Sequence, residues 1–313
     1  MAWAWAGALA AVAVAIVGGV AIANATVFSA SSFARDYLDA LRADRIHEVL
    51  ALPGVDAGGL DDRLLDPLAT SDFDFELGAD SEVDGVHSVR VTFSGMEVDG
   101  TATLKIERIG TRFGMFPEWG FASSPITPVT VALTGDARAT VGELAFELEG
   151  GAPTTFAALT PGVYTFGQQS EFLASDRSVA VAATGTETQV ALTIAPTDAF
   201  VAAVQAAMEA DLTACTTQKV LFPTRCPFGH AIENRVVSDP TWTIAEMPTA
   251  TIAASDRIGI WAVSPAAGVA HLSVQVQSLF DGRVSTLEQD VPFQAGYLIA
   301  FDGDTVVLDP RIR

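Results

Sequence analysis

Basic residues are scarce in this chain. Only 17 of its 313 residues are lysine or arginine, against 38 acidic residues, so the formal net charge is −21. Lysine itself occurs twice, at Lys105 and Lys219. Proteins that bind nucleic acid need clustered lysine and arginine side chains to contact the phosphates. The composition therefore argues against nucleic acid as a partner and indicates an acidic surface that keeps the protein soluble.

The sequence also lacks the motifs that mark common catalytic and metal sites. It has no Gly-x-Ser-x-Gly element and no phosphate-binding Gly-Lys-Ser loop. Its four histidines include no pair at the spacing of a metal-binding helix. Asp72, Asp74 and Glu76 have the spacing of the first calcium-loop ligands, but Leu77 stands where that loop needs glycine. We therefore expect no metal, no cofactor and no catalytic residue, and interpret the three carboxylates as an exposed strand face.

Charge is absent from residues 2–34, and most of this stretch is apolar. It is longer than the ~20 residues that a helix needs to cross a bilayer. Trp3 and Trp5 stand at one end, where indole rings favour the membrane interface. A cleavable signal peptide is the alternative, since Ala23-Asn24-Ala25 fits the small-x-small cleavage pattern, but no basic segment precedes it. We expect an uncleaved transmembrane anchor at residues 1–29.

Beyond the anchor, the apolar pattern predicts three domains. The first and third, residues 30–124 and 197–313, each open with a helix, capped by Ser31-Ser32 and by Thr197 respectively. Both then change to alternating strands. The middle domain, residues 125–196, has strand alternation only and fits a small β-sandwich. The apolar residues of the two helical stripes are Phe33, Tyr37, Leu38 and Leu41, and Phe200, Val201, Val204, Met208 and Leu212.

Asp-Gly pairs predict the hairpin turns of the first and third domains. They occur at Asp99-Gly100, Asp281-Gly282 and Asp302-Gly303. In both domains the long strand before the first such turn is expected to begin near a histidine, His87 or His271. We infer from this shared order that the sandwich is flanked by two similar α+β domains.

A family resemblance follows from these patterns. A helix followed by long paired strands resembles the nuclear-transport-factor-2-like (NTF2-like) cone-shaped fold, here seen twice. The stretch Leu159-Thr-Pro-Gly-Val-Tyr164 resembles small PEGA-type surface β-domains. An N-terminal span followed by such modules is similar to Gram-positive, actinobacterial-type membrane proteins related to the teicoplanin-resistance-associated family, although the zinc ribbon that many of them carry is absent here. The resemblance implies a single-pass protein of the cell membrane whose C-terminal bulk is extracytoplasmic.

The two cysteines form the clearest local prediction. Cys215 and Cys226 are the only cysteines, and Pro223 between them can stop a helix and turn the chain back. We expect a disulfide, with free buried thiols and a catalytic thiol as the alternatives. A disulfide persists only in an oxidising compartment, which agrees with the outer side of the membrane.

The leading functional hypothesis is an envelope binding or sensing protein without catalytic activity. Its expected partners are membrane lipid, through the helix, and an envelope protein or cell-wall ligand. Trp119, Trp242, Trp261 and His230 are candidates for a binding surface, although large aromatic residues more often fill cores. The stretch from Arg225 to His230 is the most individual in the chain. The alternative is a small-molecule hydrolase or isomerase that uses an Asp base beside a Tyr in a cone-shaped pocket.

Overall fold

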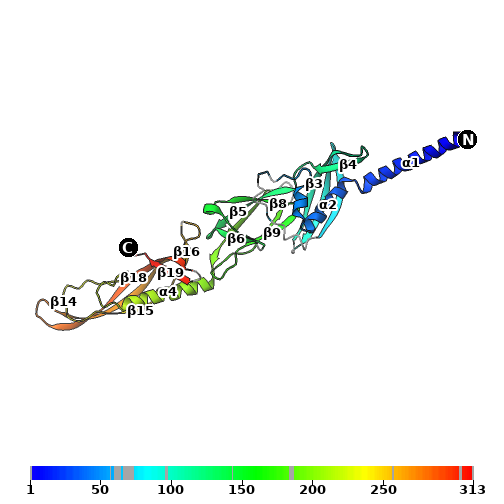
Figure 1. Ribbon diagram of the computed structural model, residues 1–313. Coiled ribbons are helices and arrows are strands. Elements are labelled where there is room, and N and C mark those ends of the chain that lie inside the picture. The colour runs from blue at the N-terminus through cyan, green and yellow to red at the C-terminus, as the bar shows by residue number, and fades with distance from the viewer. Residues whose placement is uncertain are drawn as a thin grey trace.

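The protein is elongated and rich in β-structure. The structure is a computed structural model that describes residues 2–56, 58–59, 65, 74–95, 98–142, 144–182, 187–255, 257–302 and 305–311. About 50% of the chain is strand and 20% is helix, which confirms the mainly β fold class. The first helix projects from one end, and the segment after residue 197 forms the opposite end (Figure 1).

From Ala11 onward, helix α1 (Ala2–Thr26) presents its apolar side chains to solvent. Val14 and Val17, for example, are 72% and 68% exposed. Among the residues whose side chains are described, no single helix is long and apolar enough to cross a membrane. The segments Ala11–Thr26 and Ala30–Arg42, which meet at 44°, reach the necessary length and composition only as a bent pair.

The first domain packs two helices on an antiparallel sheet. Ala34, Tyr37, Leu38 and Leu41 recur at helical spacing, so one face of the first helix is buried against the sheet. The elements are α2 (Ala30–Arg42), α3 (Ile46–Leu50), β1 (Asp74–Val83), β2 (Val86–Gly95), β3 (Val98–Arg112) and β4 (Phe116–Phe121), with strand order β1-β2-β3-β4.

Two predicted details of this domain are wrong. The cap of α2 is Ser29, whose hydroxyl accepts a hydrogen bond from the Ser32 backbone N–H, and not Ser31-Ser32. The turn of the β2–β3 hairpin lies between Gly95 and Val98, which pair with each other, so Asp99-Gly100 belongs to strand β3. Gly100 lies opposite Phe93, and the Phe93 ring covers the space that a side chain at Gly100 would need.

The middle segment is a sandwich of two small sheets. One sheet has strand order β12-β5-β8, in which β12 and β5 are parallel, and the other has order β11-β9-β6-β7. Alternate residues such as Val129, Val131, Tyr164 and Phe166 point inward and are buried. The strands are β5 (Ile126–Thr134), β6 (Arg138–Val141), β7 (Leu144–Glu147), β8 (Thr154–Leu159), β9 (Gly162–Gly167), β11 (Ser178–Ala182) and β12 (Thr188–Thr193), with a short pair β10 (Leu173–Ala174) and β13 (Ala195–Pro196) and a 3-10 turn at Glu149–Gly151.

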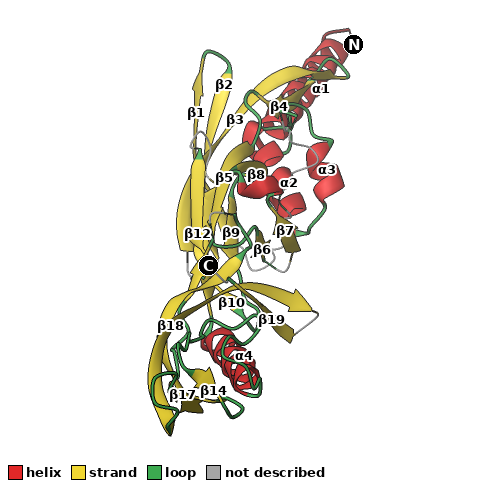
Figure 2. Ribbon diagram, turned by 90° about the vertical axis from the view of Figure 1, so that its left-hand side faces the viewer, coloured by secondary structure: helices red, strands yellow, loops and turns green. Residues whose placement is uncertain are grey.

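The third segment sets one helix against a six-stranded antiparallel sheet (Figure 2). The central strand β17 pairs with β18 on one side and with β14, β15 and β16 on the other, and β19 adds to the end of β18. Thr197 caps the helix, as predicted, by accepting a hydrogen bond from the Phe200 N–H. The elements are α4 (Asp198–Thr216), β14 (Arg235–Val236), β15 (Thr241–Glu246), β16 (Ile252–Ala254), β17 (Trp261–Gln277), β18 (Val284–Asp302) and β19 (Thr305–Pro310).

Both hairpins predicted in this segment are present. Gln277 pairs with Val284 across the loop that contains Asp281-Gly282. Asp302 pairs with Thr305 in the second hairpin, although Gly303 itself lies outside the described residues. His271, however, lies in the middle of β17 and not near its beginning.

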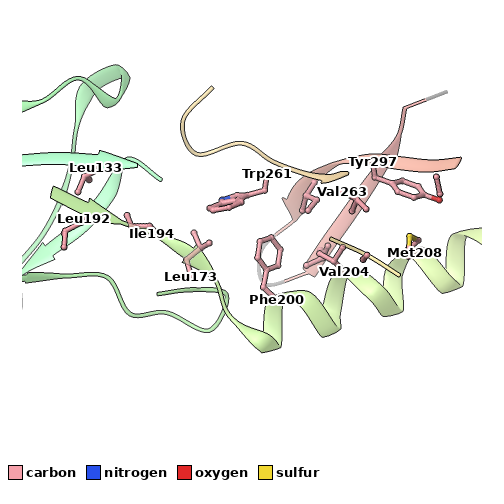
Figure 3. Close-up of a cluster of buried hydrophobic side chains, with 14 of the residues drawn as sticks. Leu133, Leu173, Leu192, Ile194, Phe200, Val204, Met208, Trp261, Val263 and Tyr297 are labelled. Atoms are coloured by element: carbon pink, nitrogen blue, oxygen red, sulfur yellow. The ribbon is translucent and has the colours of Figure 1, made fainter. Parts of the chain in front are cut away.

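The three sheets keep to the predicted segments, but the hydrophobic cores do not. Every strand pairing in the described part of the chain lies within 30–124, 125–196 or 197–313. Across the second boundary, Ile194 of the sandwich belongs to the same buried cluster as Phe200 and Trp261 of the third segment (Figure 3). Across the first boundary, between residues 30–124 and 125–196, the Tyr37 hydroxyl donates a 2.7 Å hydrogen bond to the Thr160 carbonyl. Independent folding of the three units therefore stays a prediction.

Candidate functional site

A pocket of about 560 Å³ lies in the third segment, between the loop that follows α4 and the sheet. The loop contributes most of the apolar wall, β17 contributes two residues, and the polar groups come from β18 and from the residue after β19. Volumes of this size suit a small ligand or one large side chain. The lining residues are Phe222, Pro223, Cys226, Pro227, Phe228, Gly229, Val263, Pro265, Gln294, Gly296 and Arg311.

The loop that forms this wall is tied down at several points. Cys226 is bonded to Cys215 near the end of α4, which confirms the predicted disulfide. The side-chain amide of Gln218 accepts from the Thr224 N–H at 2.7 Å and donates to the Thr224 carbonyl at 3.1 Å. Farther along, the His230 N–H donates to the Leu221 carbonyl. A short loop closed in these ways loses little further freedom when a ligand binds.

Phe228 anchors the loop to the core. Its ring is 5% exposed and lies 5.0 Å from the Trp242 ring and 5.4 Å from the Phe293 ring, measured between centroids. The Trp242 indole N–H donates in turn to the Val220 carbonyl at 2.8 Å. Phe222, by contrast, is 64% exposed and stands at the rim. The pocket thus has a fixed aromatic base and one aromatic side chain open to solvent.

The polar side of the pocket lies where β19 stops. The Arg311 N–H donates to the Gly296 carbonyl at 2.8 Å, which holds the Arg311 backbone against β18. No ion pair of Arg311 occurs in the part of the chain that the structure describes. The neighbouring Arg225 is paired with Asp309 at 3.3 Å. Of the described lining residues, Gln294 and Arg311 are the ones with polar side chains.

The predicted binding residues do not assemble into one surface. Trp242 and Trp261 are 2% and 3% exposed, so they fill cores and cannot form a binding surface, because their large apolar rings gain most from burial. Trp119 lies in the first domain, where its indole N–H donates to the Phe28 carbonyl and its ring meets His87 edge-on. His230 ends the pocket loop but does not line the cavity.

One histidine in each α+β domain, His87 in the first and His271 in the third, sits between two carboxylates. His87 lies 2.9 Å from Asp80 and His271 lies 2.6 Å from Asp290. Hydrogen bonds to Asp290 and then to Glu288 raise the pKa of His271 above its usual value. These are cross-strand pairs on exposed sheet faces, away from the pocket.

An Asp–Tyr pair is also present, as the enzymatic alternative requires. The Tyr297 hydroxyl donates to Asp211 at 3.0 Å, between α4 and β18. Burial and then the Asp211 charge raise the pKa of Tyr297. Tyr297 is 1% exposed, and neither residue lines the pocket.

The described residues contain no group of three His, Cys, Asp or Glu side chains that could hold a metal ion. Of the calcium-like spacing, Asp72 lies outside the described residues, while Asp74 and Glu76 lie on β1. No protein-family model, no curated protein and no solved structure matches this chain.

Sequence reasoning singled out one part of the pocket and missed the rest. It marked the stretch from Arg225 to His230 as unusual, and that stretch supplies four lining residues. It missed Gln294 and Arg311, which are about 70 and 85 residues farther along the chain. The pairing of β18 with β17 places Gln294, and the pairing of β18 with β19 places Arg311. Single residues on strands carry no local signal of such long-range pairing.

Proposed function

We propose that this protein is a membrane-anchored, extracytoplasmic binding protein of the cell envelope. In this proposal α1 holds the chain in the cytoplasmic membrane, and the modules extend outward to the pocket. The apolar side chains of α1 support the anchor, because soluble proteins rarely expose a continuous apolar surface of that size. The pocket lies in the segment at the other end of the elongated molecule (Figure 1).

The chemistry of the pocket lining carries the binding function. Its wall is made of phenylalanine, proline and valine, with the polar side chains of Gln294 and Arg311 on one side. Among the described residues that line it there is no carboxylate, histidine, serine, lysine or tyrosine. General acid–base or nucleophilic catalysis needs such a group within hydrogen-bonding reach of the substrate. A pocket of this composition is therefore suited to holding a ligand, and the Asp211–Tyr297 pair, which lies elsewhere, gives the hydrolase or isomerase no site here.

The disulfide supports the outer location. Cys226 is both half of that bond and a pocket residue, so the binding wall depends on oxidation. Structural disulfides are maintained in extracytoplasmic compartments and are rare in the cytoplasm. The proposal accordingly places the bulk of the chain outside the membrane.

The family assignment belongs to the same proposal. In each α+β domain a helix packs on one face of an antiparallel sheet, as in an NTF2-like cone, and the middle segment has the two-sheet form of a PEGA-like module. These likenesses are architectural. They support a relative of the teicoplanin-resistance-associated membrane proteins.

Cell fractionation combined with protease accessibility tests this function. The full chain is expected in the membrane fraction, and protease added to intact spheroplasts should degrade residues after 30. The matched control is a chain that begins at Ser31, which should leave the membrane fraction. Recovery of the full chain from the soluble fraction would refute the anchor, and protection of the bulk until the cells are lysed would refute the outward orientation.

A further inference from the structure

We propose that the pocket beside the disulfide selects an apolar carboxylate, meaning an aromatic or branched apolar group that carries a free carboxylate close by. The inference deepens the proposed function, since it rests on this pocket being the binding site. Four features support it: the size of the cavity, the rigidity of its apolar wall, the cation on one side of it, and the lack of an anion among the described lining residues.

The size and wall define the apolar part of the ligand. A cavity of about 560 Å³ has room for a phenylalanine-sized group together with a small polar end. Phe228 and Phe222 provide two aromatic surfaces, one buried and one at the rim, and Pro227 and Pro265 add flat apolar contacts. Because Phe228 is wedged between Trp242 and Phe293, its ring is already in place before a ligand arrives.

Arg311 defines the polar part of the ligand. A guanidinium matches the two oxygens of a carboxylate and can donate two parallel hydrogen bonds to it. The Arg311 backbone is fixed by its bond to Gly296, so its side chain starts from a defined point on the pocket wall. Gln294 is close enough along β18 to line the same cavity, and its amide can donate to the carboxylate or accept from a neighbouring N–H.

The charges on the rest of the chain also support an anionic ligand. The protein has a net charge of −21, and Arg225, the arginine of the pocket loop, is paired with Asp309. Arg311 has no such carboxylate partner among the described residues. A cation without a described carboxylate partner beside an apolar cavity favours an anionic ligand in that cavity.

A cationic ligand fits less well. Aromatic rings can attract a quaternary ammonium or guanidinium group, and two phenylalanines are present. That attraction is opposed by the Arg311 charge, and none of the lining residues that the structure describes is acidic. The pocket lining therefore favours anionic over cationic ligands, in addition to selecting ligands by shape.

Calorimetric titration of the full chain in nanodiscs tests the proposal. The probes are N-acetylphenylalanine and its amide, which differ only in the carboxylate, and decanoate, which represents a fatty-acid source of the same chemistry. We expect N-acetylphenylalanine to bind at least tenfold more tightly than the amide. Tighter binding of decanoate than of N-acetylphenylalanine would assign the site to acyl chains, and the reverse order would assign it to the C-terminal residue of a peptide; both keep the apolar carboxylate.

Single-residue variants test which side chains of the pocket produce the preference for the carboxylate. Arg311→Gln should remove the preference for N-acetylphenylalanine over its amide. Phe222→Ala should weaken the binding of both probes by several fold. The matched controls are Arg283→Gln and Phe280→Ala at the tip of the β17–β18 hairpin, where the two side chains are 87% and 99% exposed and lie outside the pocket lining. These two changes should leave both affinities unaltered.

The failures are distinguishable. Equal affinity for acid and amide, or an acid preference that survives Arg311→Gln, would overturn the carboxylate class while leaving a Phe222-dependent binding site in place. Binding of none of the probes at millimolar concentration would overturn the ligand assignment outright. Neither result would bear on membrane attachment or orientation, which the fractionation experiment decides.

Discussion

Removing the Cys215–Cys226 disulfide should lower the free energy of unfolding of the third domain by about 3 kcal/mol. The two cysteines are separated by 11 positions in the sequence. In the chain-entropy model, closing a loop of about 12 residues removes roughly 9 to 10 cal/mol/K from the unfolded chain, or about 2.8 kcal/mol at 25 °C. Both cysteines are nearly buried, at 4% and 9% exposure, so replacement by alanine leaves no polar group unpaired.

The assay is urea denaturation of the wild-type protein and of the Cys215→Ala/Cys226→Ala variant, followed by intrinsic fluorescence. Trp242 and Trp261 lie in the third domain and should report its transition. The free energy is obtained by linear extrapolation to zero urea. Adding a reductant to the wild type should reproduce the variant's curve, and adding it to the variant should change nothing.

Two results would contradict this reasoning. A loss below about 1 kcal/mol would mean that the loop is already restricted in the unfolded chain, so that the entropic account fails. An effect of the reductant on the double variant would show that something other than this bond is being measured. The same variant bears on the site, because Cys226 lines the pocket, and its affinity for N-acetylphenylalanine should fall together with its stability.

Three further predictions concern the interfaces and one titration. Phe200→Ala should lower the free energy of unfolding by about 3–5 kcal/mol in urea denaturation, because a fully buried ring is lost from the cluster that joins the sandwich to α4. Tyr37→Phe should cost about 1–2 kcal/mol in the same assay, because the buried Thr160 carbonyl loses its donor; no measurable change would mean that this contact does not couple the first two domains. In an NMR titration His271 should have a pKa above 6.5, and the double change Glu288→Gln/Asp290→Asn should bring it back down. Since the folded pKa is the higher one, the stabilisation from these pairs should be complete below the ordinary histidine pKa and be lost as the pH rises through the raised value.

The β2–β3 turn, which was wrongly predicted at Asp99-Gly100, shows which sequence signal determines the register of two strands. With a two-residue turn at Asp99-Gly100, Val91 would lie opposite Arg108, and a charged side chain would face the core. In the observed register Val91 pairs with Ala102 and Val89 with Leu104, so the buried face is apolar on both strands. A shift of register changes every cross-strand pair at once, and burial therefore outweighs a favourable turn dipeptide.

Local chemistry and long-range packing differ in how well they can be predicted. The disulfide, the Thr197 cap and the turn at Asp281-Gly282 were predicted correctly, because each depends on residues that are close in sequence. The pocket depends on a loop near residue 225 and a strand end at residue 311, which meet only through the sheet. Trp242 and Trp261 were candidates for a binding surface, with core packing as the more common role of such residues, and both are buried in the core.

The inferred likeness of the two α+β domains has to be argued at the level of architecture. Both contain a histidine between two carboxylates and a glycine covered by a phenylalanine ring from the neighbouring strand. In the first domain His87 and Phe93 share β2, and Gly100 is on β3. In the third domain the glycine shares a strand with the histidine, and the covering Phe293 lies on the other strand, so the two sets cannot be superimposed strand by strand. Cross-strand charge pairs and aromatic cover over glycine are general means of stabilising an antiparallel sheet, and their recurrence follows from sheet chemistry without a duplicated sequence.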